Sequence, residues 1–552
     1  MKIREILETL SLDRCTALAL CGGAGAAAGC GLIPWYIVIP VFAVLLYQAR
    51  KVWNYALAGF LLALSSGIIY SAEHDEISEL FPRSGMQRGT LIIVDSRATR
   101  VNGIVPESRL RGEFIPDEHS DVVIPVLAVL PPELKKSGVL YGDRFNVTGI
   151  LTVPGPGGFY FDGREISGTV PPPYGENYLL TVERAAALET GSGFKRFCFL
   201  VREKLLGRLI SGMKNPESRS MAARLFLGAS DGGSRIDRRN FVLSGIIHLF
   251  AVSGMHVGIL ALVCGTALGF LPFRCRNILL AVIVALYVMF SGLAVPALRA
   301  GAMIAVWCLL RAFLFFTPNR NILSLSFFVL CVVDPGSVGE LGTLYSYGIT
   351  AALILGLSRL RDWREHAGFK FEFMIPTAQY TWDLRKRQLR LRRLGSLLSA
   401  SSIAFAASSM LTMYYNNLFL PGSILTNIAT GLITPLMFGV FVLKMCFCSF
   451  FNIFDRIAGT VLESGFALLK GVSELSLELF DPEISSTPPV WLAVLFYLLL
   501  FTGLAMRKFP AALPFLSLAA ALLLLFPLAK LDQPDEIMIL AAVPGILRWW
   551  FI

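Results

Sequence analysis

The residues best suited to chemistry lie in one short apolar stretch. His248 and His256 stand eight residues apart, with Ser253 between them. On a continuous helix this spacing places both imidazoles on nearly the same face. Gly254 and Gly258 form a GxxxG pair, which permits close helix contact or a local break.

Metal and nucleophile chemistry fit this stretch poorly. Neither histidine has a Cys, Asp or Glu at metal-ligand spacing, and no nucleophile motif surrounds Ser253. The 10 cysteines lie mostly in or beside apolar runs and form no CxxC pair. No GxxxxGK[ST] phosphate loop occurs. We therefore expect no metal, no cofactor and no catalytic residue.

Three further polar residues stand inside apolar runs, where they are costly and often functional: Arg299, Ser346 and Asn427. Arg299 follows Pro296 closely, so its guanidinium either meets a phosphate in bidentate fashion or snorkels to lipid headgroups. For Ser253, His256, Ser346 and Asn427 the alternative to a transport role is hydrogen bonding between helices.

Membrane helices must position these residues. Of 552 residues, 55% are hydrophobic and only 16% are charged, and the mean hydropathy is +0.63. Apolar runs of about 17 to 20 residues recur along the chain. We predict a polytopic α-helical membrane protein of about 13 spans, with three spans in residues 1–72, a core in 241–528 and a short tail in 529–552.

Charge asymmetry between loops orients the predicted spans. Residues 359–393 hold ten Lys or Arg against four Asp or Glu and are predicted to lie in the cytoplasm. The polar block 73–190 is then external. Segment 457–480 carries Glu463 and Lys470. We predict that it spans, and the alternative is an interfacial helix, which would reverse the last two spans.

The external block 73–190 has the pattern of a small β-barrel. Turn residues separate four segments rich in Val, Ile, Leu and Thr, namely Thr90–Ser96, Asp121–Leu130, Asp143–Val153 and Tyr178–Ala186. An OB-type barrel of about five strands fits this length. Such barrels often bind single strands, but residues 86–190 hold ten Lys or Arg against thirteen Asp or Glu, which does not favour it. The aromatic run Phe159–Phe161 suits either base stacking or turn packing.

The connector 191–240 is basic, with eleven Lys or Arg against four Asp or Glu in residues 194–240. Apolar residues recur at every fourth position, at Phe197, Val201, Leu205 and Leu209. The opposite face carries Arg196, Lys204 and Arg208. This helix could rest on anionic lipid, or its basic residues could meet DNA phosphates at a pore mouth, and the two roles are compatible.

The run HLFAVSGMHVG at 248–258 resembles the signature of the ComEC competence family. Weaker matches follow in family order: Val295–Met303 with its intramembrane arginine, Arg320-Asn321, Asp334-Pro335 and Gly342 to Ser346. The resemblance extends over roughly residues 1–528 and includes the order of anchor, OB-like barrel and membrane core. The family's Phe-Gln pair stands here as Thr343-Leu344.

The resemblance implies a channel in the bacterial inner membrane that carries single-stranded DNA inward during natural transformation. Implied partners are membrane lipid, a periplasmic or surface DNA receptor and a cytoplasmic helicase-type motor. The metallo-β-lactamase-like domain of many members is not found, so we expect no nuclease activity and a separate nuclease. The sequence leaves undecided whether the protein forms a homo-oligomer. The alternatives are a transporter or flippase of another anionic substrate, and a degenerate structural membrane partner.

Overall fold

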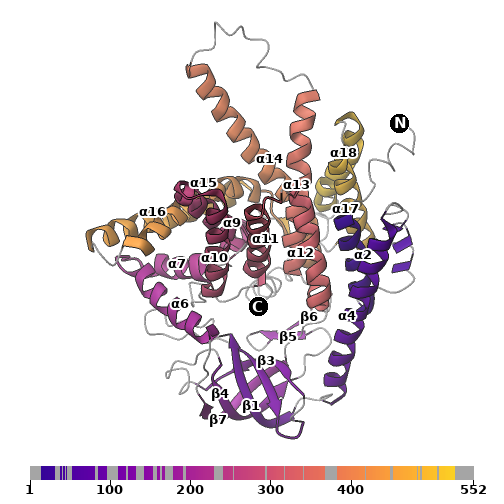
Figure 1. Cartoon of the computed structure of the whole chain (residues 1–552), viewed down its shortest axis with the longest axis vertical. Coiled ribbons are helices and arrows are strands. Elements are labelled where there is room, and N and C mark those ends of the chain that lie inside the picture. Colours follow the sequence, from indigo (N-terminus) through magenta and orange to yellow (C-terminus); the bar gives the residue numbers. More distant parts are fainter. Residues whose placement is uncertain are drawn as a thin grey trace.

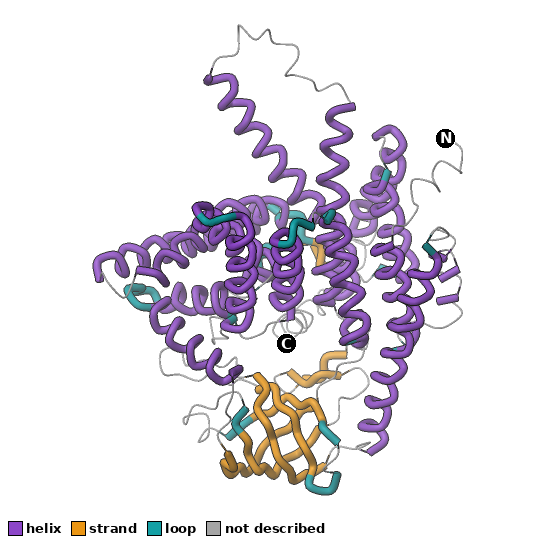
Figure 2. The backbone as a smooth tube through the Cα atoms, in the orientation of Figure 1, coloured by secondary structure: helices purple, strands orange, loops and turns teal. Residues whose placement is uncertain are grey.

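The chain is mostly helical in the computed structural model, with a β-barrel at one end (Figure 2). The structure describes residues 14–31, 38–39, 42–43, 45–46, 52–80, 85–95, 110–119, 122–131, 142–152, 158–161, 164–167, 178–189, 194–228, 240–250, 252, 254–291, 295–315, 317–339, 341–366, 382–416, 418–447, 452–480, 483–484, 488–506 and 509–528.

Five strands close the barrel: β1 (Gly85–Asp95), β2 (Leu110–Pro116), β3 (Ile124–Val129), β4 (Arg144–Thr152) and β7 (Tyr178–Glu189). Their order is β1-β2-β3-β7-β4, and β4 pairs back onto β1. Only the β3–β7 pair is parallel. Leu91, Phe114, Val126, Val147 and Leu180 fill the interior.

The predicted barrel and its four predicted strands are confirmed. Strand β2 and the hairpin of β5 (Gly158–Phe161) with β6 (Arg164–Ser167) were not predicted. The strand β2 reads LRGEFIP, and its two charges and glycine weaken the signal of β-propensity.

Among the described residues, two long helices precede the barrel, and residues 38–39, 42–43 and 45–46 are also helical. Helices α2 (Arg14–Gly29) and α4 (Trp53–Leu80) pack so closely that a side chain at Gly25 would meet the carbonyl of Phe60 at 2.3 Å. Such contact is typical of small residues between membrane helices. Helix α4 continues beyond the boundary predicted at residue 72. Of the three spans predicted in residues 1–72, the middle one falls in residues 34–47, most of which lie outside the described residues.

Further helices with described bounds follow the barrel in chain order. They are α6 (Phe194–Ile210), α7 (Pro216–Leu227), η1 (Ile247–Phe250), α9 (Gly254–Ala267), η2 (Leu268–Phe270), α10 (Phe273–Phe290), α11 (Val295–Ala312), α12 (Asn319–Val333), η3 (Pro335–Gly339), α13 (Leu341–His366), α14 (Trp382–Asn416), α15 (Ser423–Phe447), α16 (Asn452–Leu479), α17 (Val490–Ala505) and α18 (Phe509–Leu528). A short ladder of β8 (Leu418–Phe419) and β9 (Glu483–Ile484) ties the α14–α15 connection to the segment after α16.

Within the described residues, five helical segments are long and apolar enough to cross a membrane: Asn54–Ala72, Phe273–Phe290, Leu341–Leu360, Gly395–Asn416 and Ser423–Met445. Shorter apolar segments occur at Cys15–Gly29, Gly254–Phe270, Asn319–Val333, Trp491–Ala505 and Ala512–Leu523. These findings support a membrane protein, but the predicted count of thirteen spans is not confirmed. Helix α16, predicted to span, is not among these segments.

Helix α16 runs across the direction of α10 to α13 (Figure 1) and has three distinct faces. One face is buried against the core through Leu462, Phe466 and Leu469. One flank of that face exposes apolar side chains, at Ile453, Ile457, Val461, Leu468, Leu475 and Leu479. The other flank carries the charged residues Arg456, Glu463, Lys470, Glu474 and Glu478. Apolar and charged flanks on opposite sides favour a helix lying in the membrane interface.

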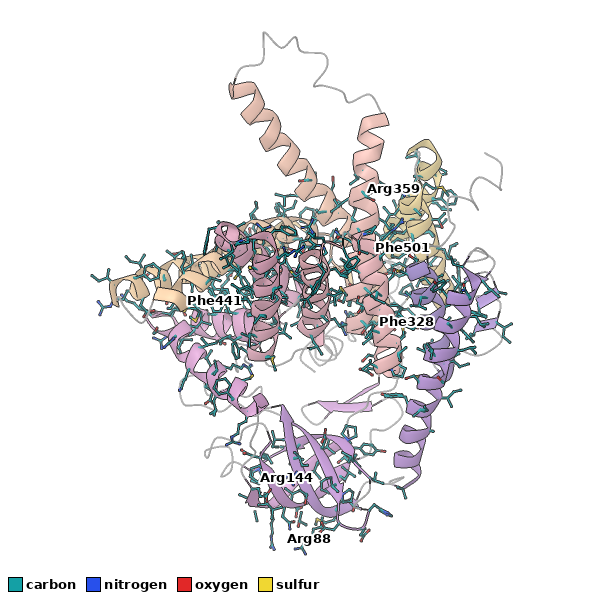
Figure 3. All side chains as sticks on the ribbon, viewed as in Figure 1. Arg88, Arg144, Phe328, Arg359, Phe441 and Phe501 are labelled. Carbon is teal, nitrogen blue, oxygen red and sulfur yellow. The ribbon has the colours of Figure 1, made fainter. Side chains whose placement is uncertain are left out.

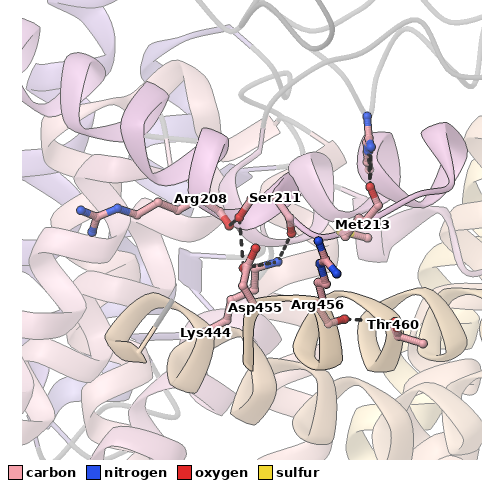
Figure 4. Close-up of polar contacts among 8 residues, drawn as sticks. Arg208, Ser211, Met213, Lys444, Asp455, Arg456 and Thr460 are labelled. Atoms are coloured by element: carbon pink, nitrogen blue, oxygen red, sulfur yellow. Dashed lines mark hydrogen bonds and ion pairs between the residues drawn. The ribbon is translucent and has the colours of Figure 1, made fainter. Parts of the chain in front are cut away.

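A buried ion pair joins α15, α16 and the α6–α7 turn (Figure 4). The Lys444 ammonium is fully buried, lies 3.1 Å from Asp455 Oδ1 and donates to the carbonyl of Ser211. The Ser211 hydroxyl donates to the same carboxylate oxygen at 3.0 Å. Nearby, Glu463 Oε1 accepts from the backbone N–H of Asn215 at 2.7 Å. Because a buried charge is tolerated when paired and hydrogen-bonded, these contacts fix α16 to the connector.

The face that α6 buries differs from the predicted one. Cys198, Arg202, Leu206 and Leu209 point inward, whereas Phe197 is 56% exposed. Arg202 is almost fully buried, and its Nε donates to the carbonyl of Leu227 at 3.1 Å. The four-residue apolar spacing is therefore only partly right. Leu209 is buried and Leu205 packs against the same core, but the buried face also includes Arg202, because α7 supplies a backbone acceptor for its guanidinium.

Candidate functional site

The apolar run 241–271, at the start of the predicted membrane core, is not one continuous helix. The chain turns at Gly245 with φ +77°, forms the short helix η1 and begins α9 only at Gly254. A side chain at Gly245 would meet Ser423 Cβ at 2.7 Å, so glycine suits both the left-handed backbone and the space. His248 and His256 consequently lie on different elements, and the expectation that they share one helical face is wrong.

Neighbouring helices stabilise this break with hydrogen bonds. Thr426 Oγ1 of α15 donates to the Ser244 carbonyl at 2.9 Å, and Ser473 Oγ of α16 donates to Ser244 Oγ at 2.7 Å. His248 Nδ1 lies 2.9 Å from the Gly245 carbonyl oxygen. Irregular backbone at membrane depth requires such partners within the protein, so the break is a built feature of the core.

His256 lies in the first turn of α9 and is fully buried. Its imidazole stacks on Phe438 of α15, with ring centroids 5.4 Å apart and an interplanar angle of 19°. Phe438 also packs edge-on against Phe226 at 4.9 Å, and the Tyr287 hydroxyl donates to the Phe226 carbonyl at 2.9 Å. This aromatic cluster holds the imidazole in one orientation.

The two glycines of the GxxxG pair have different surroundings. A Cβ at Gly254 would lie 3.0 Å from Ala300 Cβ on α11, whereas one at Gly258 would meet nothing within 4 Å. The predicted close helix contact is therefore found at Gly254, where the start of α9 touches α11 one residue from Arg299.

Arg299 points into the protein. It is only 6% exposed, and its Nη1 donates to Thr343 Oγ1 on α13 at 2.9 Å. This burial is the opposite of snorkelling to headgroups, one of the two roles considered from the sequence. Ser346 follows Thr343 by almost one helical turn. Sequence reasoning did not select Thr343, although a hydroxyl in the first turn of an apolar helix is a usable signal.

The three helices around Arg299 begin at the same end of the molecule. Short connections reverse the chain after α9, α10, α11 and α12, so α9, α11 and α13 run in the same direction, with their N-termini toward the barrel (Figure 1). Helix N-termini carry partial positive charge. Together with the guanidinium they make this end of the helices favourable to an anion.

The other predicted residues are more scattered. Asn427 lies on α15 eleven residues before Phe438, about 16 Å along the helix axis, and its carbonyl accepts from Thr430 Oγ1 at 3.0 Å. Ser253 lies outside the described residues. Among the residues described, no three His, Cys, Asp or Glu side chains gather in a way that could hold a metal ion.

The three predicted DNA-contact residues differ in availability. Arg196 forms an ion pair with Asp143 beside strand β4, which couples α6 to the barrel. Lys204 and Arg208 are exposed on α6. On the barrel, Arg88 and Arg144 project outward (Figure 3) and lie 3.8 and 3.9 Å from carboxylates of Asp117 and Glu189.

These features define a helical membrane protein with a broken core helix, a buried arginine and an appended barrel. The model of the competence protein family matches residues 225–510, just over half of the chain. The chain belongs to this family. The match includes the break, His256, Arg299 and α16.

One curated relative is ComE operon protein 3 of Bacillus subtilis (strain 168). It is 32% identical over 120 residues, which make up 21% of this chain and 15% of that protein. The similarity therefore extends over less than a sixth of that relative's length. No solved structure matches the chain.

Proposed function

We propose that this protein is an inner-membrane channel that carries single-stranded DNA inward during natural transformation. The observation that carries the proposal is the buried Arg299, held by Thr343 where α9, α11 and α13 begin. A strand entering from the barrel end would bring its phosphates to this positive group of helix ends. Membership of the competence protein family supports the same reading.

We further propose that the barrel is of the OB type. Its strand order, with the third and fifth barrel strands parallel and the fourth returning to the first, fits a five-stranded Greek-key barrel. Because Arg88 and Arg144 face carboxylates, the barrel surface offers little unbalanced positive charge. Phosphate contacts at the mouth are better assigned to Lys204 and Arg208 of α6.

We propose that other proteins supply the driving force and the nuclease activity. The chain has no phosphate-loop motif, and its five histidines form no HxHxDH run. A periplasmic or surface receptor would deliver the DNA, a cytoplasmic helicase-type motor would draw it in, and a separate nuclease would degrade the other strand. We also propose that the barrel lies on the outer side of the membrane.

Substitution of Arg299 tests the proposed site. In Arg299→Gln the charge that meets phosphate is lost, and entry of labelled DNA into the cytoplasm should fall at least about tenfold, or 1.4 kcal/mol. Arg299→Lys keeps the charge but loses the fork geometry, so part of the uptake should remain. Uptake is normalised to the amount of protein in the membrane.

Arg311→Gln is the matched control. Arg311 lies in the last turn of the same helix α11, over the ring of Trp307 at 4.4 Å, and its substitution should leave uptake unchanged. Wild-type uptake in Arg299→Gln would remove this residue from the site. A loss of protein that parallels the loss of uptake would reduce it to a structural role.

A further inference from the structure

The hydroxyl of Tyr497 on α17 contacts the backbone of α14. It donates to the Ala407 carbonyl at 2.9 Å and accepts from the Leu411 N–H at 3.1 Å. These two backbone groups stand four residues apart, so they are the partners of one hydrogen bond of the helix ladder. A single side chain from another helix therefore bonds both ends of the same rung.

Three more hydroxyls compete for backbone carbonyls in the same two turns of α14. Ser408 and Ser409 donate to the Phe405 carbonyl at 3.2 and 2.5 Å, and Thr412 donates to the Ser408 carbonyl at 2.9 Å. Back-bonding of this kind weakens the ladder and bends helices. The weakened stretch therefore extends over residues 405–412.

Neighbouring side chains hold the Tyr497 ring in position. Its ring packs against Phe496 and Phe501 of its own helix, with centroids 5.2 and 6.3 Å away. The buried Met410 and Met413 complete the surrounding core, and methionine adapts readily to altered packing. The neighbours of the rung can therefore tolerate a change in the direction of α14.

Opening a rung in an apolar environment normally leaves a bare N–H and a bare C=O, which is costly. At this rung the Tyr497 hydroxyl already bonds both groups, so opening leaves neither without a partner. The stretch Ala407–Leu411 thus has the features of a hinge, because inserted side chains are a common cause of helix bends.

We propose that α14 is a two-part lever whose hinge lies at Ala407–Leu411, and that Tyr497 is the positioning residue that permits it to bend. The arm is Trp382–Ala406. Its first part projects with α13 beyond the helical bundle at the end opposite the barrel (Figures 1 and 2), whereas Ser401 and Ile403 lie within the bundle, where Ser401 Oγ donates to the Ile424 carbonyl at 2.7 Å. The basic start of the arm lies where DNA or a motor would act, and this consequence rests on the proposed function.

Tyr497→Phe removes the hydroxyl and keeps the ring. Nitroxide labels at exposed Leu398 on the arm and exposed Leu436 on α15, in a background without native cysteines, report their separation by pulsed electron paramagnetic resonance in phospholipid vesicles without DNA. The wild-type distance distribution should be broad, and Tyr497→Phe should narrow it. DNA uptake by this variant should fall about tenfold at equal protein level.

Tyr414→Phe is the control, since it removes a phenolic hydroxyl from α14 itself, three residues beyond the rung. It should match wild type in both measurements. An unchanged distance distribution in Tyr497→Phe would overturn the hinge, as would a loss of membrane protein that accounts for the lost uptake. A narrowed distribution with normal uptake would uphold the hinge and count against its role in the proposed transport.

Discussion

Arg299 and Thr343 meet because two helices separated by α12 begin at the same end of the molecule. A charged side chain at the centre of a membrane helix costs about 2.5–3.5 kcal/mol on insertion scales. A hydrogen bond to a charged group returns about 1.5–3 kcal/mol. The bond to Thr343 therefore offsets much of the cost of burying Arg299.

His256 should act through its nitrogens rather than through its ring. His256→Phe retains an aromatic ring to stack on Phe438 but removes both polar atoms, so the variant should accumulate normally in the membrane and lose most DNA uptake. His256→Gln keeps hydrogen bonding and should retain part of it. Full uptake in His256→Phe, measured per molecule of membrane protein, would reduce the imidazole to packing.

Both residues could be selected from the sequence because each is a polar group within an apolar run. The residues that contact them in the structure could not be selected in this way. Thr343 lies 44 residues from Arg299, and Phe438 lies still further from His256. The prediction that His248 and His256 share one helical face failed for the same reason. The left-handed turn at Gly245 that separates them lies against Ser423, which is distant in the sequence.

At the scale of elements, the sequence allows α16 to be either a membrane span or an interfacial helix. The packing of α16 in the structure distinguishes the two. The sequence predicts that this segment spans the membrane despite its charges. In the structure the buried face separates an apolar flank from a charged flank, and Glu463 and Asp455 bond the α6–α7 turn. Contacts with neighbouring helices thus determine which side of the amphipathic helix is buried.

An interfacial α16 predicts different reactivity on its two flanks. With native cysteines replaced, Glu474→Cys on the charged flank should react quickly with a water-soluble maleimide in membrane vesicles open to the reagent on both sides. Leu468→Cys on the apolar flank should react slowly, because lipid covers it. Equal protection of both positions would favour a helix that spans the membrane.

Helix α6 marks the limit of reading an amphipathic face from spacing alone. Its apolar residues recur at every fourth position, yet the structure buries Arg202 and exposes Phe197. The buried face depends on what packs against the helix, here α7 with the Leu227 carbonyl. Strand segments in the barrel were easier to recognise, since alternation and turn residues are local signals.

At the scale of the whole molecule, the barrel lies at one end and the projecting ends of α13 and α14 lie at the other (Figure 1). This arrangement is compatible with the orientation that loop charges predict. Glu118→Cys on the barrel should react with an impermeant reagent in intact cells. Arg387→Cys should react only after permeabilisation, and labelling of Arg387→Cys in intact cells would contradict the orientation.

The proposed transport of DNA across the membrane can be tested by deleting the gene and following labelled DNA in a competent host that relies on this protein. We expect that DNA still binds the cell surface of the deletion strain while nuclease-resistant DNA in the cytoplasm falls below detection, and that the wild-type gene restores it. Normal entry of DNA in the deletion strain, with a defect only in transport of another anionic substrate, would show that this protein is not the DNA channel.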